Sequence, residues 1–335
     1  MDNRPVRLEK HPLKDFYKAN SKLLNVILMI VIVFVGGEIV LDLLGGTPGS
    51  FLSVRQVFLT VRIAAFTALF GLCQMLVICA GGGGLDLSVG YIATLSGILG
   101  ARLMDGSNSG ILPSVLAALA VGFVFGLLNG LLTAYAGLPP LVVTMAMANI
   151  VQGIINAYVA ATPIQGQTAP ALAWLGAKFT GIFPNIMIVL IIGVVVMAVI
   201  IGKTKIGVKI LGVGSNDVTA YLSGVNVRRV RCIAFIASGV IAALIGIILV
   251  GYLGQAAKDM GDNYVMPSIV AVVVGGCSIN GGEANYLTVV LGAVVLQSLT
   301  NLFVALGWGD AGKWLGYGII LLIMLAVYVR GKRSR

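Results

Sequence analysis

The stretch Cys79-Ala-Gly-Gly-Gly-Gly-Leu-Asp-Leu-Ser-Val-Gly90 decides the fold. It lies between two long apolar runs, so four consecutive glycines and an aspartate interrupt what would otherwise be a membrane-spanning helix. An unwound backbone inside lipid must find hydrogen-bond partners in surrounding protein or in a water-filled cavity. An ionisable side chain there costs about 2.5–3.5 kcal/mol on insertion scales and usually faces a pathway. A broken helix that carries Asp86 therefore indicates a transporter rather than a passive anchor.

Composition places the whole chain in a membrane. Of its 335 residues, 59% are apolar and only 10% are charged, and the mean hydropathy is +1.03. A soluble protein of this length needs far more charge on its surface. Long apolar runs such as residues 66–80 and 186–201 are typical of membrane helices. The sequence therefore predicts an all-α polytopic integral membrane protein.

Basic residues mark the cytoplasmic side. The formal net charge is +10, and 16 of the 22 lysines and arginines lie near the N-terminus, in one internal loop and at the C-terminus. Such clusters beside apolar spans stay in the cytoplasm. We therefore predict a basic cytoplasmic tail at residues 1–22, a transmembrane domain at 23–330 with a cytoplasmic loop at 203–231, and a second basic tail at 331–335. There is no room for a folded basic domain, so nucleic acid is not an expected partner.

Hydropathy predicts about ten spans. They are expected at residues 23–44, 57–80, 87–104, 111–136, 140–161, 183–202, 232–256, 265–277, 286–306 and 313–330. From a cytoplasmic N-terminus, six spans return the chain to the cytoplasm at the basic loop, and four more return it there at the basic C-terminus. The number of spans therefore agrees with the positions of the basic residues. The eighth span is too short for a straight crossing, and we expect a re-entrant or half-helix there.

A second glycine-rich break resembles the first. Gly275-Gly-Cys-Ser-Ile-Asn-Gly-Gly-Glu283 also ends one apolar run and precedes another that is rich in small residues. Paired interruptions in corresponding places indicate two pseudo-repeated halves with a pathway at their interface. Asn280, in this second break, is therefore a candidate pathway residue, and its alternative is a solvated turn.

Asp86 and Ser88 have two interpretations. Either they line or gate a pathway at the end of a broken helix, or they cap the first free amides of the next span, a position that Asp and Ser prefer. Both can hold together, because a cap beside a cavity also shapes that cavity.

Neutral polar side chains within the apolar spans are further candidates. They are Asn129, Thr144, Asn149, Gln152, Asn156, Gln297 and Asn301. Asn149, Gln152 and Asn156 share one helix face, and Gln297 and Asn301 share another. Such stripes suit an uncharged, polyhydroxylated solute, which needs donors and acceptors but no counter-ion. The alternative is hydrogen bonding between helices, worth about 0.6 kcal/mol per pair.

The internal basic loop contains the signals of one short helix. Within residues 215–224, Ser215 or Asn216 can cap the helix start and Gly224 can end it. A partner subunit can bind such a helix, and the alternative is an ordinary connecting helix. The residues expected to carry the contact are Asn216, Asp217, Ala220, Ser223 and Gly224.

The sequence contains no recognisable catalytic or metal-binding set. Its four cysteines lie singly, and its one histidine lies in the basic tail. Gly202-Lys203-Thr204 resembles the end of a phosphate-binding loop, but Met197 stands where such a loop requires glycine. We therefore expect no enzyme activity, no metal and no cofactor in this chain. Energy must come from a partner or from an ion gradient.

Four segments form an ordered set of motifs along the chain. They are Gly83-Gly-Leu-Asp-Leu-Ser-Val-Gly90, Asn129-Gly130 followed by Pro139-Pro140, residues 216–227, and residues 269–282. Together they resemble the membrane permease subunits of bacterial ATP-binding cassette (ABC) sugar importers of the ribose, galactose and xylose type. Thr219 and Glu283 depart from the pattern, because the family usually has alanine and arginine there.

This resemblance implies a permease subunit for a monosaccharide in the bacterial inner membrane. It implies a pore of two permease subunits, identical or different, and a periplasmic sugar-binding protein that delivers the solute. It also implies a cytoplasmic ATPase subunit that binds ATP and Mg²⁺ and docks near residues 215–227.

Two other functions stay open from the residues alone. A related ABC permease for a nucleoside, a branched amino acid, a furanosyl signal molecule or inositol would share these segments. An ion-coupled secondary transporter would instead use Asp86 as a proton or sodium site.

Overall fold

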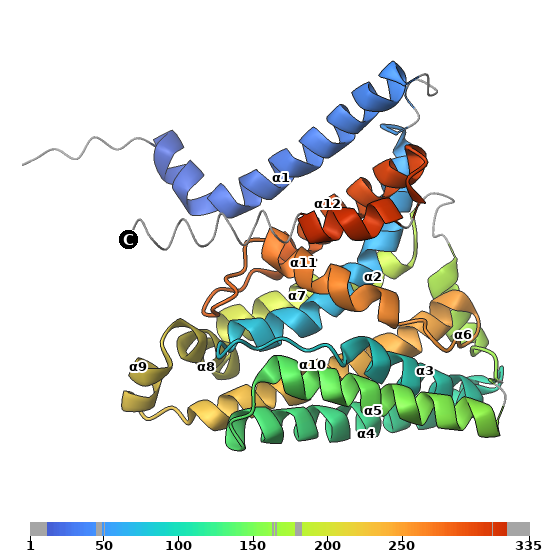
Figure 1. Cartoon of the computed structure of the whole chain (residues 1–335), viewed down its shortest axis with the longest axis vertical. Helices are drawn as coiled ribbons and strands as arrows, with labels where there is room; N and C mark the ends of the chain where they lie inside the picture. Colours follow the sequence, from blue (N-terminus) through green and yellow to red (C-terminus); the bar gives the residue numbers. More distant parts are fainter. Residues whose placement is uncertain are drawn as a thin grey trace, which may run out of the picture.

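The computed structural model describes residues 12–44, 49, 51–162, 164, 166–177, 183–309 and 311–319, with side chains from residue 20 onward. In this part of the chain the regular structure is helical. The helices are α1 (Pro12–Leu43), α2 (Val54–Cys79), α3 (Val89–Met104), α4 (Ile111–Gly130), α5 (Pro140–Ala161), α6 (Pro170–Ala173), α7 (Ile186–Lys203), α8 (Lys205–Ser215), α9 (Asp217–Leu222), α10 (Val227–Leu253), α11 (Val265–Val274) and α12 (Tyr286–Ala305) (Figure 1).

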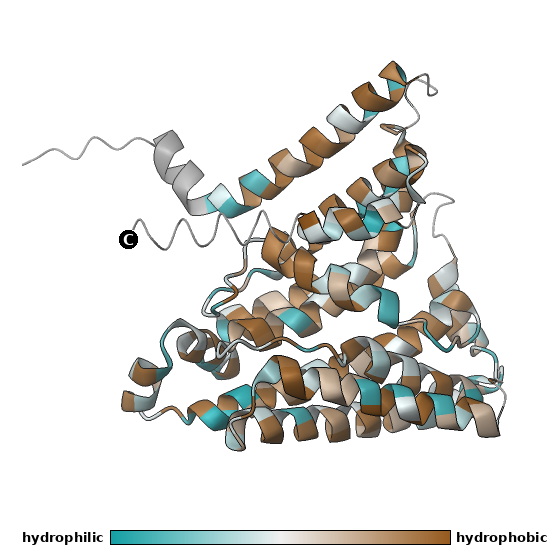
Figure 2. Cartoon of the chain, viewed as in Figure 1, coloured by the Kyte–Doolittle hydropathy of each residue, from teal (hydrophilic) through white to brown (hydrophobic). Residues whose placement is uncertain are grey.

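Seven of the described helices are long and apolar enough to cross a membrane. They are α1 (from Asn20), α2, α4, α5, α7, α10 and α12. α3 and α11 are shorter and also apolar, and apolar residues cover much of the helix surfaces (Figure 2). The prediction of an all-α polytopic membrane protein is confirmed. Residues 311–319 are helical too, but most of the predicted span 313–330 lies outside the described residues.

The core of the molecule is built on α2 and α10. Of the most apolar 18-residue window in each, 83% is buried in α2 and 61% in α10. α10 packs against α2, α3 and α4, while α12 packs against α2. Gly122 and Gly126 of α4 meet the α10 backbone directly: a Cβ added at Gly122 would lie 2.5 Å from the carbonyl oxygen of Gly239. Glycine is required there because any side chain would push the two helices apart.

The first glycine-rich break is an unwound re-entry of the chain. Residues 80–88 run without helix from the end of α2 to the start of α3, which lies in the middle of the bundle (Figure 1). Gly81, Gly82 and Gly83 have φ values of +72°, +70° and +71°. Glycine adopts this left-handed conformation freely, whereas other residues are strained in it. The glycines therefore let the chain turn back into the bundle immediately after α2.

The second break has a different form. α11 has ten residues and is about 15 Å long, which is about half of a bilayer's hydrocarbon core. The eighth predicted span is therefore a short helix, and its re-entrant path stays a prediction. Residues 275–285 then turn toward α12 at the end of the molecule that carries α8. The repeat relation between the two halves stays a prediction.

Two predicted boundaries differ from the structure. α1 already begins at Pro12, so the end of the predicted tail 1–22 is helical. The loop 203–231 contains two helices, α8 and α9, where one was expected. The additional helix is α8, whose N-cap residue Thr204 accepts a hydrogen bond from the Gly207 amide. The predicted tail 331–335 lies outside the described residues.

Candidate translocation and coupling sites

Asp86 is fully buried at the start of α3, where its carboxylate is held by three donors. Its Oδ1 accepts hydrogen bonds from the backbone N of Ser88 at 3.0 Å and from the Ser88 hydroxyl at 2.6 Å. Its Oδ2 accepts a bond from the hydroxyl of Ser238 on α10 at 3.1 Å. The carboxylate thus fixes the first turn of α3 and ties it to α10. Ser88 is the N-cap residue of α3 and makes no side-chain capping bond, so Asp86 holds the amide just before the helix and whether it also gates a pathway stays a prediction.

The unwound backbone around Asp86 is satisfied by polar side chains from neighbouring helices. Gln74 of α2 donates to the Asp86 carbonyl at 2.6 Å and accepts from the Asp86 amide at 3.2 Å. Thr144 of α5 donates to the Leu85 carbonyl at 3.0 Å, and Asn129 of α4 donates to the Ser88 hydroxyl at 2.9 Å. These bonds supply the partners that an unwound segment needs inside lipid.

The sequence analysis missed two members of this network, Gln74 and Ser238. Each is a polar residue inside a strongly apolar helix, and that placement was the available signal. Their partner could not be read from the sequence, because Ser238 lies 152 positions from Asp86.

The polar face of α5, formed by Asn149, Gln152 and Asn156, points out of the molecule. Asn149 and Asn156 are exposed, whereas the opposite face of the helix packs against α3 and α4. The Gln152 amide nitrogen donates to Asn156 Oδ1 at 3.3 Å. Gln152 Oε1 is buried and has no hydrogen-bond partner among the described residues. The Asn149 amide nitrogen donates to the Met145 carbonyl at 3.0 Å. The outer side of α5 thus carries polar side chains whose hydrogen bonds stay within the helix.

The other predicted pathway residues lie on different elements. Gln297 of α12 donates to Asn301 at 2.9 Å, and Asn301 donates to Thr60 of α2 at 2.8 Å. This pair therefore makes the bonds between helices that were its alternative interpretation. Asn280 is exposed in the turn after α11, where its backbone N donates to the Ser278 hydroxyl. Of the ten candidate residues, the structure brings Asp86, Ser88, Asn129 and Thr144 together at the first break, and the other six lie elsewhere.

The short helix predicted at 215–224 is present as α9. Asn216 caps it by accepting from the Thr219 amide at 2.9 Å, and Gly224 follows it with φ +81°. Its apolar side chains Val218, Tyr221 and Leu222 are 64%, 70% and 79% exposed. The sequence analysis did not select these three, although apolar residues in a short helix of a basic loop were a visible signal.

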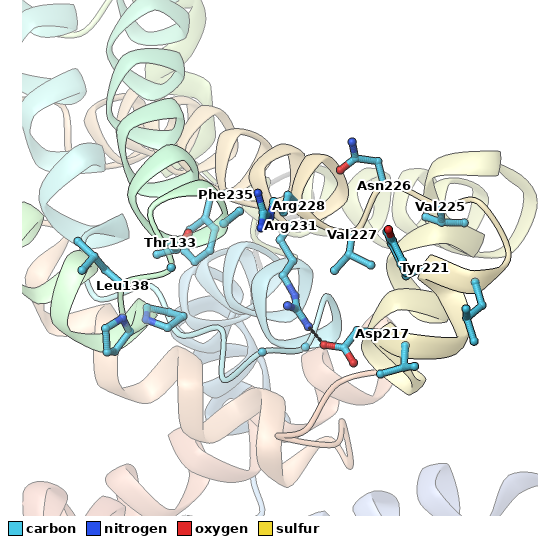
Figure 3. A pocket seen from close by; sticks show the side chains of 18 of the residues that line it. Thr133, Leu138, Asp217, Tyr221, Val225, Asn226, Val227, Arg228, Arg231 and Phe235 are labelled. Atoms are coloured by element: carbon cyan, nitrogen blue, oxygen red, sulfur yellow. Dashed lines mark hydrogen bonds and ion pairs between the residues drawn. The ribbon is translucent and has the colours of Figure 1, made fainter.

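A groove of about 1460 Å³ lies beside α9 (Figure 3). One wall is α9 with the start of α10, and the other is the turn from Thr133 to Pro140 between α4 and α5. Tyr221 and Leu222 line it together with Arg228 and Arg231. Figure 3 shows Arg231 reaching Asp217, with which it forms an ion pair at 3.0 Å.

Glu283, at the end of the second break, pairs with Lys22 of α1. Among the described residues, no group of three or more His, Cys, Asp or Glu side chains is placed to hold a metal ion.

Comparison with known proteins gives the family. The family model described as "Branched-chain amino acid transport system / permease component" matches residues 56–328. The ribose import permease protein RbsC of Escherichia coli K12 is 28% identical over 85% of this chain and 88% of its own length. The fructose import permease protein FrcC of Rhizobium meliloti is 30% identical over 83% and 79%. The galactofuranose transporter permease protein YtfT of Escherichia coli K12 is 31% identical over 81% of each chain. No solved structure matches.

The fold and these matches define a membrane permease component. This chain belongs to the family of branched-chain amino acid transport system permease components, and its relatives include permease subunits of sugar importers. The resemblance to ABC sugar permeases is therefore confirmed, and the members of this family are transport components rather than enzymes.

Proposed function

We propose that this chain is the permease subunit of an ABC importer and that its solute, a monosaccharide, crosses along the polar face of α5. The observation that carries the proposal is the exposure of Asn149 and Asn156 on a membrane span. Polar side chains within a bilayer are costly and usually face the bundle interior or a cavity. A second permease subunit, identical or different, placed against α5 would give this face a polar neighbour and leave a path between the subunits.

The chemistry of this face fits an uncharged solute. The whole of α5 contains no charged residue, while Asn149, Gln152 and Asn156 offer both donors and acceptors. Sugar hydroxyls need both, and three relatives are named for ribose, fructose and galactofuranose. A nucleoside, a branched amino acid and inositol are the other solutes that the test below includes.

The exposed apolar side chains of α9 fit a docking role. Val218, Tyr221 and Leu222 are largely exposed beside the groove, and a cytoplasmic ATPase subunit would bury them. That subunit would hold the ATP and Mg²⁺. The basic clusters favour a cytoplasmic position for α9 and for both termini. The chain would then span the inner membrane, and a periplasmic sugar-binding protein would act on the opposite side.

The environment of Asp86 favours ATP over an ion gradient as the energy source. Its carboxylate is enclosed and accepts three hydrogen bonds that fix α3 and α10. A proton or sodium site must instead exchange its ion with water during each cycle.

Uptake into proteoliposomes tests the proposal. The chain would be reconstituted with its cognate ATPase and binding protein. Uptake of labelled pentoses, hexoses, inositol, a nucleoside and leucine would then be measured with and without ATP on the side of the ATPase. We expect uptake of a monosaccharide only with hydrolysable ATP and with no effect of ionophores. Equal uptake without nucleotide, or loss of uptake with ionophores alone, would refute an ABC importer, and uptake of leucine alone would refute the sugar.

A further inference from the structure

Both glycine-rich breaks meet the α8–α9 segment at contacts between backbones. A Cβ added at Gly214 of α8 would lie 1.9 Å from the Cys79 carbonyl oxygen and 2.4 Å from the Gly282 nitrogen. A Cβ added at Gly281 would lie 2.8 Å from the Gly81 Cα and 3.0 Å from the Gly214 Cα. We call Gly81, Gly214, Gly281 and Gly282 the glycine junction. It joins the end of α2, the end of α8 and the turn after α11 with no side chain between them.

Hydrogen bonds hold the same three segments together. The Gly282 nitrogen donates to the Cys79 carbonyl at 3.1 Å, and the Cys79 thiol donates to the Glu283 carbonyl at 2.7 Å. The Ser215 hydroxyl, at the end of α8, donates to the Leu211 carbonyl at 2.8 Å and lies 3.4 Å from the Gly282 carbonyl oxygen. The junction is therefore bonded as well as closely packed.

Arg231 makes a second connection between α9 and the first break. Its guanidinium pairs with Asp217 of α9 at 3.0 Å, and its Nε donates to the Ala80 carbonyl at 3.3 Å. Its Cζ would lie 2.9 Å from a Cβ at Gly82, so the guanidinium lies against the glycine backbone. One side chain thus holds the first residue of α9 and the start of the unwound segment. Figure 3 shows the pairing with Asp217.

We propose that Arg231 is a positioning residue that, together with the glycine junction, couples movement of α9 to both glycine-broken segments. The proposal rests on the proposed docking of an ATPase at α9. Contacts between backbones contain no rotatable side chain that could absorb a displacement, and close-packed interiors transmit strain. A shift of α8 and α9 therefore moves residues 80–88, which lead to Asp86 and α3, and also residues 275–285, which lead to α12.

The alternative is that these contacts are only a fixed brace. A brace would affect the stability of the permease, whereas a coupling element would affect how much solute crosses per ATP hydrolysed. The two roles can therefore be separated by measuring stability, ATPase binding and transport stoichiometry on the same protein.

The experiment compares Arg231→Gln, Arg231→Lys and Arg229→Gln in the reconstituted complex. Arg229 is an exposed neighbour on the same helix turn and serves as the matched control. ATPase retained per permease, thermal stability, ATP hydrolysis and uptake would be measured for each. We expect Arg231→Gln to keep the ATPase bound and its KM for ATP unchanged, but to lower solute moved per ATP by about fivefold. Arg231→Lys should restore part of the loss, because it keeps the charge opposite Asp217, and Arg229→Gln should behave as wild type.

Unchanged transport per ATP in Arg231→Gln would overturn the proposal, and so would a loss confined to stability or to ATPase binding. Gly214→Ala is an independent test, because its Cβ would displace the Cys79 backbone. In the assembled complex it should also lower the solute moved per ATP. An unchanged value would overturn the proposal as well. A wrong docking site can be distinguished from a wrong coupling role. If the ATPase does not dock at α9, substitutions of Val218 and Leu222 leave the amount of bound ATPase unchanged.

Discussion

Asp86 shows how a buried charge can serve structure in a transport protein. Its carboxylate accepts from Ser88 twice and from Ser238 once, and it is fully enclosed by protein. Hydrogen bonds to an ionised group contribute about 1.5–3 kcal/mol each, which offsets part of the cost of burying the charge. The residue therefore stabilises the start of α3 and its contact with α10.

Replacing Asp86 distinguishes a structural carboxylate from an ion site. Asp86→Ala leaves the buried Ser88 and Ser238 donors without an acceptor, at about 1–3 kcal/mol for each. We expect its midpoint of thermal unfolding and its transport to fall together. Asp86→Asn keeps one carbonyl acceptor and should lose less of both. An ion site would give the opposite pattern, with Asp86→Asn as stable as wild type but inactive in uptake.

The candidate residues were predicted with uneven success, for a physical reason. The contact of Asp86 with Ser88 at the start of α3 could be predicted because it depends on residues close together in the sequence. The bonds from Gln74 and Ser238 could not, because they depend on how distant helices pack. For the same reason Gln297 and Asn301 looked like pathway residues, although Asn301 bonds to Thr60, 241 positions away.

At the scale of the elements, glycine determines how closely α4 and α10 approach. A Cβ added at Gly126 would lie 2.7 Å from the Phe235 carbonyl oxygen and 2.9 Å from the Ile236 Cα. Neither backbone atom can rotate away as a side chain could, so the helices must separate to admit any larger residue.

Gly126→Ala should therefore destabilise the permease by about 1–3 kcal/mol through overpacking. Gly36→Ala on α1 is the matched control, because nothing lies within 4 Å of its added Cβ. Alanine is the better helix former, so this control should be neutral or slightly stabilising. Thermal unfolding in detergent, followed by size-exclusion chromatography, measures both. A Gly126→Ala protein as stable as Gly36→Ala would contradict this account of the packing.

The elements themselves were largely predictable from hydropathy. Spans such as α2, α5 and α12 are long apolar runs, and the ten-residue α11 was recognisable as too short for a full crossing. The path of residues 80–88 was not predictable, because glycine permits many backbone conformations and packing selects one. α8 was missed because its segment, which carries Lys205 and Lys209, was assigned to a loop that was identified only by its charge.

The exposed face of α9 makes a prediction about docking. Val218→Asp and Leu222→Asp place charges where a partner must bury apolar surface, so we expect them to lower the ATPase recovered with the purified permease by about tenfold or more. Val208→Asp on α8 is the control, since Val208 is 63% exposed but does not line the groove. Equal recovery from Leu222→Asp and Val208→Asp would place the docking site elsewhere.

At the scale of the whole molecule, two surfaces face in different directions and need different partners. α9 lies at one end of the bundle, while α5 runs along its side (Figure 1). The groove lies beside α9, and the polar face is on α5. α5 makes its described packing contacts mainly with α3 and α4, so its outer face is free to meet another subunit. By contrast, the exposed residues of α7 before Lys203 in its last turn are apolar, as expected for a surface against lipid.

Crosslinking tests which helix meets the second permease subunit. The native cysteines Cys73, Cys79, Cys232 and Cys277 are all buried, so single cysteines can be introduced at the surface after these are replaced by serine or alanine. Asn156→Cys on α5 should give a crosslinked pair of permease subunits with a short bifunctional thiol reagent in membranes. Val195→Cys, 57% exposed on α7, is the control and should remain uncrosslinked. Added solute should slow the reaction at Asn156→Cys, because the proposed path runs along that face. A crosslink formed only through Val195→Cys would place the subunit interface on α7 and would remove the polar face of α5 from the pathway.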